Sequence, residues 1–295
     1  MTTSARQRVA AFWDAHIAAW LNGEDQLPPW LKDWYDSYVG AGPGEVTREG
    51  FPEPYHGDLL GLEHTPRMVV LGLNPGEFCS RFQSREGIFA QEIKRHFSYS
   101  RWATTRPYNR PPWTLPDEMG ENRYYQARLE FTRRWLQDPN ADHRDLLIFE
   151  CYPWHSKAIT APLRPPPEVI EEFVWQPIAE LPVQDVFAFG RPWDDVAQAL
   201  GLREAGRLGH GGVDYKSAVP TRAVRLYWLP SGQRLVVEWH PGAAGPPSAK
   251  ETALLRHALV GAAGDGCGEP LTPRPRAGVP NASPLVPAAG EDPPA

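Results

Sequence analysis

The sequence predicts an α/β protein built around a parallel sheet. Four short apolar runs, each bounded by turn residues, lie along the chain, helical patterns separate them, and Gly/Pro-rich turns follow the first and last runs. Short apolar runs are typical of strands that are covered on both faces. Because strands alternate with helices, we expect right-handed crossovers and a parallel sheet.

The N-terminal part predicts one helix before the first strand. Residues 5–22 place Trp13 and other large apolar side chains on one stripe, which indicates an amphipathic helix that packs against the core. Residues 23–66 are rich in Pro and Gly and form an irregular approach. The first strand then begins at Arg67, in the run RMVVLGLNPGEF that ends at Phe78.

The later elements follow the same alternation. Strands are expected at residues 145–150 (DLLIFE), 185–190 (DVFAFG) and 234–239 (RLVVEW). Helices are expected at residues 124–137, 167–178, 192–200 and 248–260. The last helix has a predicted capping box, because Glu251 follows Ser248 by one turn.

Composition indicates one domain followed by a tail. A chain of 295 residues with 41% hydrophobic content can bury one α/β core and has little room for two. Residues 261–295 are Pro-rich and poor in large apolar residues, so we interpret them as a disordered tail. No run approaches the ~20 apolar residues of a membrane span, and the start MTTSARQRVAAFW lacks a signal-peptide pattern. A cytoplasmic protein with no membrane partner is expected.

The cysteines give no sign of a metal site. Cys79, Cys151 and Cys267 are widely spaced and form neither a CxxC pair nor a Cys/His cluster. We therefore expect no structural zinc, no iron–sulfur cluster and no other cofactor, and we interpret Cys151 as a buried thiol.

Two strand ends carry the candidate catalytic side chains. The first strand runs into Gly72-Leu73-Asn74-Pro75-Gly76, and the last strand ends VVEWHPG with His240 before Pro-Gly. In an open parallel sheet the ligand crevice lies outside the carboxyl ends of the strands. Asn74 and His240 are therefore expected to converge on one substrate.

At these residues the chain resembles the uracil-DNA glycosylase superfamily. Its mismatch-specific and single-strand-selective branches carry GxNPG as their first motif and a His-Pro or Asn-Pro turn as their second, and the resemblance covers roughly residues 60–260. It implies a three-layer α/β/α domain over residues 1–260, with a four-stranded parallel sheet in the order 2-1-3-4. It also implies a monomeric, monofunctional enzyme that hydrolyses the bond between a base and deoxyribose.

The resemblance assigns a role to each strand-end residue. Cleavage of the N-glycosidic bond builds positive charge on the sugar and negative charge on the leaving base. His240 would donate to the pyrimidine O2, and Asn74 would position the attacking water without deprotonating it. The alternative for His240 is a structural role. Further substrate contacts are expected from Leu73, Pro75, Gly76, Phe78, Glu150 and Gly242.

Phe78 occupies the place at which the single-strand-selective branch stacks a ring on the flipped base. The turn from Pro75 to Phe78 would also supply backbone N–H groups to the substrate. The alternative is an ordinary strand-to-helix turn with Phe78 in the core.

Glu150 marks a departure from that branch. There the second strand ends Asn-x-Cys-Pro, and the amide reads uracil; here the matching stretch is Glu150-Cys151-Tyr152-Pro153. An ionised carboxylate would face uracil O4 with like charge. A carboxyl kept protonated by burial would instead match N4–H and N3 of cytosine. The alternative is that Glu150 pairs with an arginine or with His155 and never meets a base.

The expected substrate is therefore a modified cytosine-type pyrimidine in DNA. Since removal of ordinary cytosine would destroy the host's own DNA, a substituent at C5, as in the hypermodified cytosines of some phage genomes, would be the second criterion, with anti-phage defence as the role. Three alternatives stay open: a uracil or damaged-base glycosylase in repair, an inactive DNA-binding module on the same fold, and an unrelated α/β enzyme. No GxGxxG or GxxxxGK[ST] motif supports the last of these.

A long insert at residues 79–143 is the candidate DNA-binding segment. Arg101, Arg106 and Arg110 are interpreted as phosphate contacts, and the aromatic residues between them as stacking surfaces for unpaired bases. The alternative is a Pro-rich flap that packs its own tryptophans. The net charge of −6 argues mildly against a nucleic-acid partner. Small residues after His240 would fill a flipped-base gap poorly, so single-stranded or distorted DNA is expected.

Overall fold

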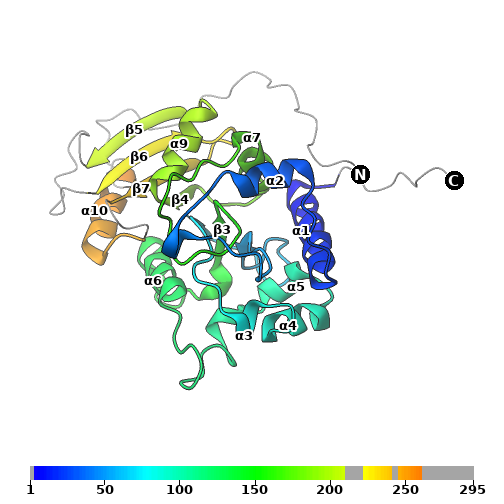
Figure 1. Cartoon of the computed structure of the whole chain (residues 1–295). Coiled ribbons are helices and arrows are strands. Elements are labelled where there is room, and N and C mark those ends of the chain that lie inside the picture. Colours follow the sequence, from blue (N-terminus) through cyan, green and yellow to red (C-terminus); the bar gives the residue numbers. More distant parts are fainter. Residues whose placement is uncertain (1–2, 210–221, 241–244, 261–295) are drawn as a thin grey trace.

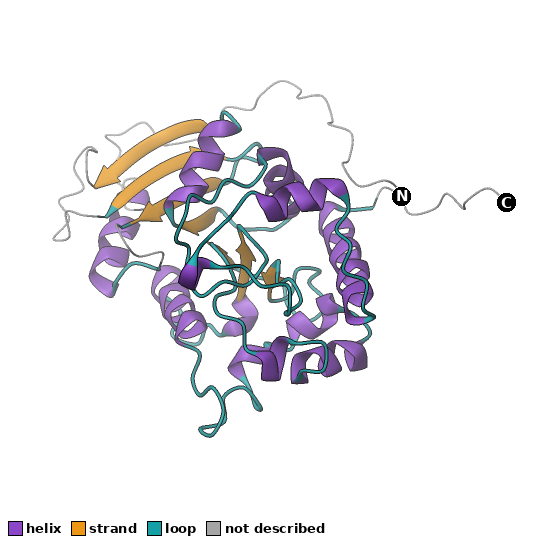
Figure 2. Ribbon diagram, in the orientation of Figure 1, coloured by secondary structure: helices purple, strands orange, loops and turns teal. Residues whose placement is uncertain are grey.

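The computed structural model describes residues 3–209, 222–240 and 245–260 (Figure 1). These ranges form one seven-stranded mixed sheet with the strand order β1-β3-β2-β4-β7-β6-β5, flanked by helices (Figure 2). Its parallel part consists of β3 (Leu146–Glu150), β2 (Met68–Gly72), β4 (Asp185–Phe189) and β7 (Arg234–Trp239). These are the four predicted strands, in the predicted order 2-1-3-4.

The prediction of a sheet with four strands only is wrong. β1 (Tyr55–His56) pairs antiparallel with β3, and β6 (Ala223–Trp228) and β5 (Arg203–Gly209) extend the sheet antiparallel beyond β7. β1 is too short to leave a pattern. β6 alternates buried and half-buried residues and carries charge, as is typical of antiparallel strands with one wet face. A search for continuous apolar runs therefore misses these strands.

All five predicted helices are present in the described residues. The α-helices are α1 (Ala5–Leu21), α2 (Pro29–Asp36), α3 (Ser80–Gln83), α4 (Ile88–His96), α5 (Tyr99–Thr104), α6 (Arg123–Leu136), α7 (Pro167–Ile170), α8 (Gln176–Ala179), α9 (Arg191–Ala199) and α10 (Ala249–Val260). A π-helical stretch at Glu171–Trp175 joins α7 to α8, and single 3₁₀ turns lie at Gly42–Gly44, Pro107–Asn109 and His143–Asp145. α2 lies in the segment predicted to be irregular, and α3, α4 and α5 lie in the insert.

Capping boxes start the first and the last helix. At α10 the Ser248 amide donates to Glu251 at 2.8 Å and the Glu251 amide donates to Ser248 Oγ at 3.4 Å, so this predicted box is confirmed. At α1 the same arrangement joins Ser4 and Gln7. Each box satisfies two backbone donors that a helix start would otherwise leave unpaired.

One face of the parallel strands packs against α6. The strand register places Ile148, Val70 and Phe187 in one row. The rings of Phe131 and Trp135 in α6 lie 4.9 and 4.6 Å from the ring of Phe187. α10 packs on α6, which closes this side of the sheet.

The opposite face packs against the N-terminal and insert helices. The ring of Phe149 lies 6.0 Å from Tyr55, which in turn lies 5.3 Å from Tyr99 of α5. α5 and α8 both pack against α1. Helices thus cover both faces of the parallel strands, as their continuous apolar sequences require. No helix in the described part of the chain is long and apolar enough to span a bilayer.

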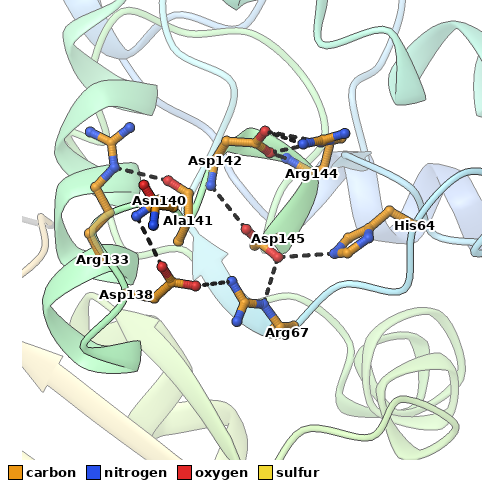
Figure 3. A network of polar contacts seen from close by, with 9 residues as sticks. All are labelled: His64, Arg67, Arg133, Asp138, Asn140, Ala141, Asp142, Arg144 and Asp145. Carbon is orange, nitrogen blue, oxygen red and sulfur yellow. Dashed lines mark hydrogen bonds and ion pairs between the residues drawn. The ribbon is translucent and has the colours of Figure 1, made fainter.

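A polar network joins the starts of β2 and β3 (Figure 3). Arg67 Nε donates to Asp145 Oδ1 at 2.7 Å, and its Nη2 donates to Asp138 at 2.8 Å. His64 lies 3.0 Å from the same Asp145 oxygen, and the Asp142 amide donates to the other at 2.9 Å. Burial alone would raise the pKa of Asp145, but the hydrogen bonds from Arg67, Asp142 and His64 lower it to about 2. The network fixes the two strands at the end opposite the candidate site.

We predict that Asp145→Asn destabilises the fold by about 1–3 kcal/mol, because charge-assisted hydrogen bonds from Arg67 and His64 are lost. The folded pKa lies below the ordinary value of 3.8, so the ionised carboxyl stabilises the fold above that pH and loses its effect as the pH falls towards about 2. The difference in unfolding free energy between wild type and variant should therefore shrink over that acid range in urea titrations. Arg144→Gln, which removes only an exposed pair with Asp142, is the control and should leave the free energy of unfolding nearly unchanged. Equal stability of Asp145→Asn and wild type at neutral pH would contradict this role.

Candidate functional site

The carboxyl ends of β2, β3 and β4 meet closely. Gly72 at the end of β2 lies opposite Glu150 at the end of β3. Leu73 is partly buried and packs against Gly190, where any added side chain would meet the Leu73 methyl groups at 2.8 Å. Gly190 also has φ +120°, a conformation that glycine adopts readily. The structure therefore places the predicted substrate contact Leu73 in a packing contact between two strand ends.

Asn74 is held in a defined orientation by a residue that the sequence did not indicate. Its Nδ2 donates to the backbone oxygen of Ser156 at 2.7 Å and to Ser156 Oγ at 3.1 Å. Ser156 Oγ in turn donates to the Ala158 carbonyl at 3.1 Å. Within the described ranges nothing donates to Asn74 Oδ1, so the amide keeps its acceptor side for another molecule.

The turn after Asn74 is open and has unused donors. The backbone N–H groups of Gly76, Glu77 and Phe78 donate no hydrogen bond to any described residue. Pro75 and Gly76 are partly exposed, and Gly76 adopts φ +89°. Three consecutive free amides form a short row of donors that can hold oxygen atoms of a substrate.

Phe78 lies outside the core. Its half-exposed ring rests 6.1 Å from the ring of His155, and it passes so close to Gly50 that an added Cβ there would come within 2.9 Å of it. The ring lines an open depression together with Trp20 and Arg85. The alternative that Phe78 is a core residue is therefore wrong, and its exposed ring can stack on a flat ligand.

Glu150 is buried, with one oxygen free. It is 1% exposed, Tyr124 donates its hydroxyl to Oε1 at 2.5 Å, and Oε2 has no hydrogen bond in the described structure. Oε2 lies over Gly72, where a side chain would collide with it. Burial raises the pKa of Glu150 to about 7, against the opposing effects of Tyr124 and Arg128. Its carboxyl can therefore be protonated near neutral pH.

Neither of the ion-pair partners that the alternative gives to Glu150 is found beside it in the described structure. His155 lies beside Glu53 instead, at 3.4 Å, and no described arginine forms an ion pair with Glu150. Arg128, whose charge lowers the pKa of Glu150, stacks 3.3 Å from the ring centre of Tyr124 and donates to the Tyr124 carbonyl at 3.0 Å. Tyr124 lies at the start of α6 and is half-exposed, whereas Glu150 is buried. A ligand that reaches Glu150 from this side would therefore have to pass the Tyr124 ring.

A buried hydrogen-bond network around Glu53 lies next to the candidate site. Glu53 Oε1 accepts from Gln83 Nε2 at 2.8 Å and from the Tyr108 hydroxyl at 2.5 Å, while its Oε2 lies 2.8 Å from His56. Burial would raise the pKa of Glu53, yet hydrogen bonds from His155 and His56 hold it well below the usual range. The network thus connects residues 23–66, the insert at residues 79–143 and His155, whose ring contacts Phe78. Glu53 could not be found from the sequence, since nothing in the stretch PEPYH distinguishes it from an ordinary loop residue.

The aromatic residues of the insert form its own core. Trp102, Tyr108 and Trp113 are buried, and the rings of Phe89 and Trp113 stack at 5.6 Å while those of Tyr108 and Tyr125 stack at 5.2 Å. The interpretation of these rings as stacking surfaces for bases is therefore wrong. Burial of large aromatic rings stabilises the fold, so a segment rich in them tends to pack them in its core. Arginines interleaved with aromatic residues therefore do not by themselves identify a nucleic-acid surface.

The three predicted phosphate contacts differ in their surroundings. Arg110 is committed to the fold, because its Nη2 pairs with Glu92 at 2.8 Å and its Nε donates to the Thr105 carbonyl at 3.2 Å. Arg106 is partly buried and lines a small cavity with His143. Arg101 is exposed. Of the three, only Arg101 presents its side chain fully to solvent.

The last strand brings a second buried carboxyl to the same edge. Glu238 of β7 is 1% exposed and lies opposite Phe189 of β4. Burial raises its pKa to about 7, and Arg222 lies 3.4 Å away. A glutamate inside an apolar strand is unusual, and the run VVEWHPG could have revealed it. His240 follows and is partly buried, and Gly242 lies outside the described residues.

The candidate site residues thus follow the carboxyl ends of strands in the same sheet, but they are not equally close to one another. Asn74 and Glu150 follow the adjacent strands β2 and β3. His240 follows β7, with β4 between β7 and β2. Because neighbouring strands lie ~4.8 Å apart, the ends of β2 and β7, which lead to Asn74 and His240, are about 10 Å apart along the edge. Within the described residues, no group of His, Cys, Asp and Glu side chains could hold a metal ion.

Comparison with known proteins adds no relative to this picture. No protein-family model matches the chain, and searches of curated proteins and of solved structures find no significant match.

Proposed function

We propose that the protein is a monofunctional DNA glycosylase that removes a modified cytosine-type pyrimidine and leaves an abasic site. The observation that carries the proposal is the buried Glu150 carboxyl, which lies in register with Gly72 just before the Asn74 turn. Burial raises its pKa to about 7, so a protonated and an ionised form are both accessible near neutral pH. A protonated carboxyl offers one donor and one acceptor, which is the pattern that cytosine N3 and N4–H require.

The turn after β2 supplies the water-positioning group. Since the amide nitrogen of Asn74 is held by Ser156, its Oδ1 can accept a hydrogen bond from water and aim that water at the anomeric carbon. His240 would donate to O2 of the leaving pyrimidine, where negative charge develops. The free amides of Gly76, Glu77 and Phe78 would bind further oxygen atoms of the flipped nucleotide.

In the proposed reaction, Phe78 would stack on the flipped base. Its half-exposed ring rests on His155 and can stack on a planar base without moving core residues. The base must first leave the helical stack, so single-stranded or distorted DNA is the favoured substrate. A C5 substituent, as in hypermodified phage cytosines, would distinguish foreign DNA from the host's own, and the role would be anti-phage defence.

One observation favours a second candidate, a glycosylase for uracil or a damaged base. Tyr124 already donates to Glu150, and Arg128 stacks on its ring. If this arrangement persists when DNA binds, Glu150 does not read the base, and Asn74, Phe78 and His240 would act on a base chosen by other contacts.

We predict that Asn74→Ala and His240→Ala each lower the rate of base excision by ~10²–10³, because one loses the positioned water and the other the donor to O2. Single-turnover excision from single-stranded DNA with glucosylated 5-hydroxymethylcytosine measures the rate. Asn140→Ala and His257→Ala remove the same residue types elsewhere on the surface and should keep wild-type rates. A folded His240→Ala variant with full activity would rule out the catalytic assignment.

Glu150→Gln should change the preferred base. The variant keeps the size of the side chain and replaces the carboxyl by an amide that can accept from N3–H and donate to O4 of uracil. We expect the preference for modified cytosine over uracil to fall about tenfold or more, since a good contact to a base edge is worth ~1–3 kcal/mol. Glu238→Gln alters the other buried strand-end glutamate and is the matched control. An unchanged substrate profile in Glu150→Gln would show that Glu150 is not a reader.

The proposal also predicts a pH dependence. Below its pKa of about 7 the Glu150 carboxyl is protonated and can donate to N3, and above it that donor is lost. The value of kcat/KM for a cytosine-type substrate should therefore fall as the pH rises through about 7. Glu150→Gln should lack this part of the pH profile. A wild-type profile that stays flat across neutral pH would indicate that the ionised form, or another residue, contacts the base.

A further inference from the structure

Phe97 is the most exposed large apolar side chain in the described part of the chain, at 91%. It caps the C-terminus of α4 with φ 64° and ψ −2°, the left-handed conformation that glycine usually supplies at this position. A phenylalanine here is unfavourable twice, because its backbone is strained and its ring is in water. Packing of the fold therefore gives no reason for this side chain.

Three exposed cations lie within four residues of Phe97 in the chain. Lys94, Arg95 and Arg101 are exposed, and none of them forms an ion pair with a described acidic residue. The dipole of α4 favours Lys94 and Arg95 in its last turn. Arg101 lies in the last turn of α5, whose dipole favours it in the same way, so helix dipoles are compatible with the three cations but give no reason for the exposed ring of Phe97. In a chain of net charge −6 this is a local concentration of positive charge.

The ring stands on a rigid base. Ser98 accepts from the Arg101 amide at 3.2 Å and caps α5. The next residue, Tyr99, is buried and donates its hydroxyl to the Tyr55 carbonyl at 2.5 Å. Ser100 donates to Asp14 Oδ1 of α1 at 2.7 Å. The turn that presents Phe97 is thus fixed to the sheet edge and to α1.

We propose that Phe97 with Lys94, Arg95 and Arg101 forms a docking point for single-stranded DNA. The ring stacks on an unpaired base, and the cations contact the flanking phosphates, the combination that proteins use to bind single strands. α4 packs between α5 and α3, and α3 follows closely after the turn that carries Phe78, so the docking point belongs to the helices that adjoin the candidate site. The proposal deepens the proposed function and rests on it only for the choice of DNA.

An anionic membrane fits this surface less well. Membrane-surface binding needs an extended apolar face, whereas a nucleotide needs one ring. The other exposed large apolar side chains of the described part are Val39, Leu62, Leu115, Met119 and Val260, and none lies on α4 or α5. A single ring among cations therefore favours a nucleic-acid strand.

The test uses the full chain and a fluorescent oligothymidylate, with binding followed by anisotropy. Phe97→Gly relaxes the left-handed turn, so the melting temperature should rise by about 2 °C while the affinity falls about tenfold or more. Phe97→Trp should retain the affinity. Replacing Lys94, Arg95 and Arg101 by Gln should lower the salt slope by about 2. Val39→Ala, at another side chain that is 80% exposed, and Arg144→Gln, at a paired arginine, are the matched controls and should change neither quantity.

Wild-type affinity in Phe97→Gly would overturn the docking point. Binding of the wild type to phosphatidylserine vesicles without any binding to oligothymidylate would overturn it in favour of a membrane. The two proposals fail separately. Phe97-dependent binding without excision of any base contradicts the glycosylase alone, and excision with unchanged Phe97→Gly binding contradicts the docking point alone.

Discussion

The proposed chemistry depends on one constraint, a carboxyl group buried at the end of β3. Glu150 has room only because Gly72 opposite it has no side chain, and one of its oxygens has no partner in the described structure. An unpaired buried oxygen is costly unless the group is neutral or meets a ligand. Burial raises the pKa of Glu150 to about 7, which makes the neutral form accessible. The unpaired oxygen of Glu150 destabilises the fold, and it lies at the edge of the sheet where a ligand is expected to bind. This combination favours a functional role for Glu150.

The remaining site residues are positioned by parts of the chain outside the parallel sheet. Ser156 orients Asn74, and His155 supports the ring of Phe78. His155 is itself fixed next to Glu53, which also binds Gln83 and Tyr108 of the insert. The insert therefore acts as a scaffold for the site, and its stability should influence the geometry at Asn74 even where it touches no substrate.

The sequence predicted those elements whose signals are local. Short apolar strands and the Ser248 capping box depend on neighbouring residues, so they could be found without tertiary information. β5 and β6 could not be predicted from apolar runs, because antiparallel strands with one solvent-exposed face alternate apolar and polar residues. The burial of Trp102 and Trp113 could not be predicted either, because it depends on segments that are distant in the chain. The partner of Asn74 and the partners of Glu53 in the insert could not be predicted either, since each of these contacts joins residues far apart in the chain.

The most direct test of the central claim is the substrate range of the wild-type protein. Single-stranded DNA that carries one uracil, cytosine, 5-hydroxymethylcytosine or glucosylated 5-hydroxymethylcytosine is incubated with the protein and treated with alkali, which cleaves at abasic sites. We expect cleavage at a modified cytosine and none at ordinary cytosine or uracil. Cleavage at uracil alone would contradict the role of Glu150 as a reader of the base, and no cleavage of any strand would contradict the glycosylase.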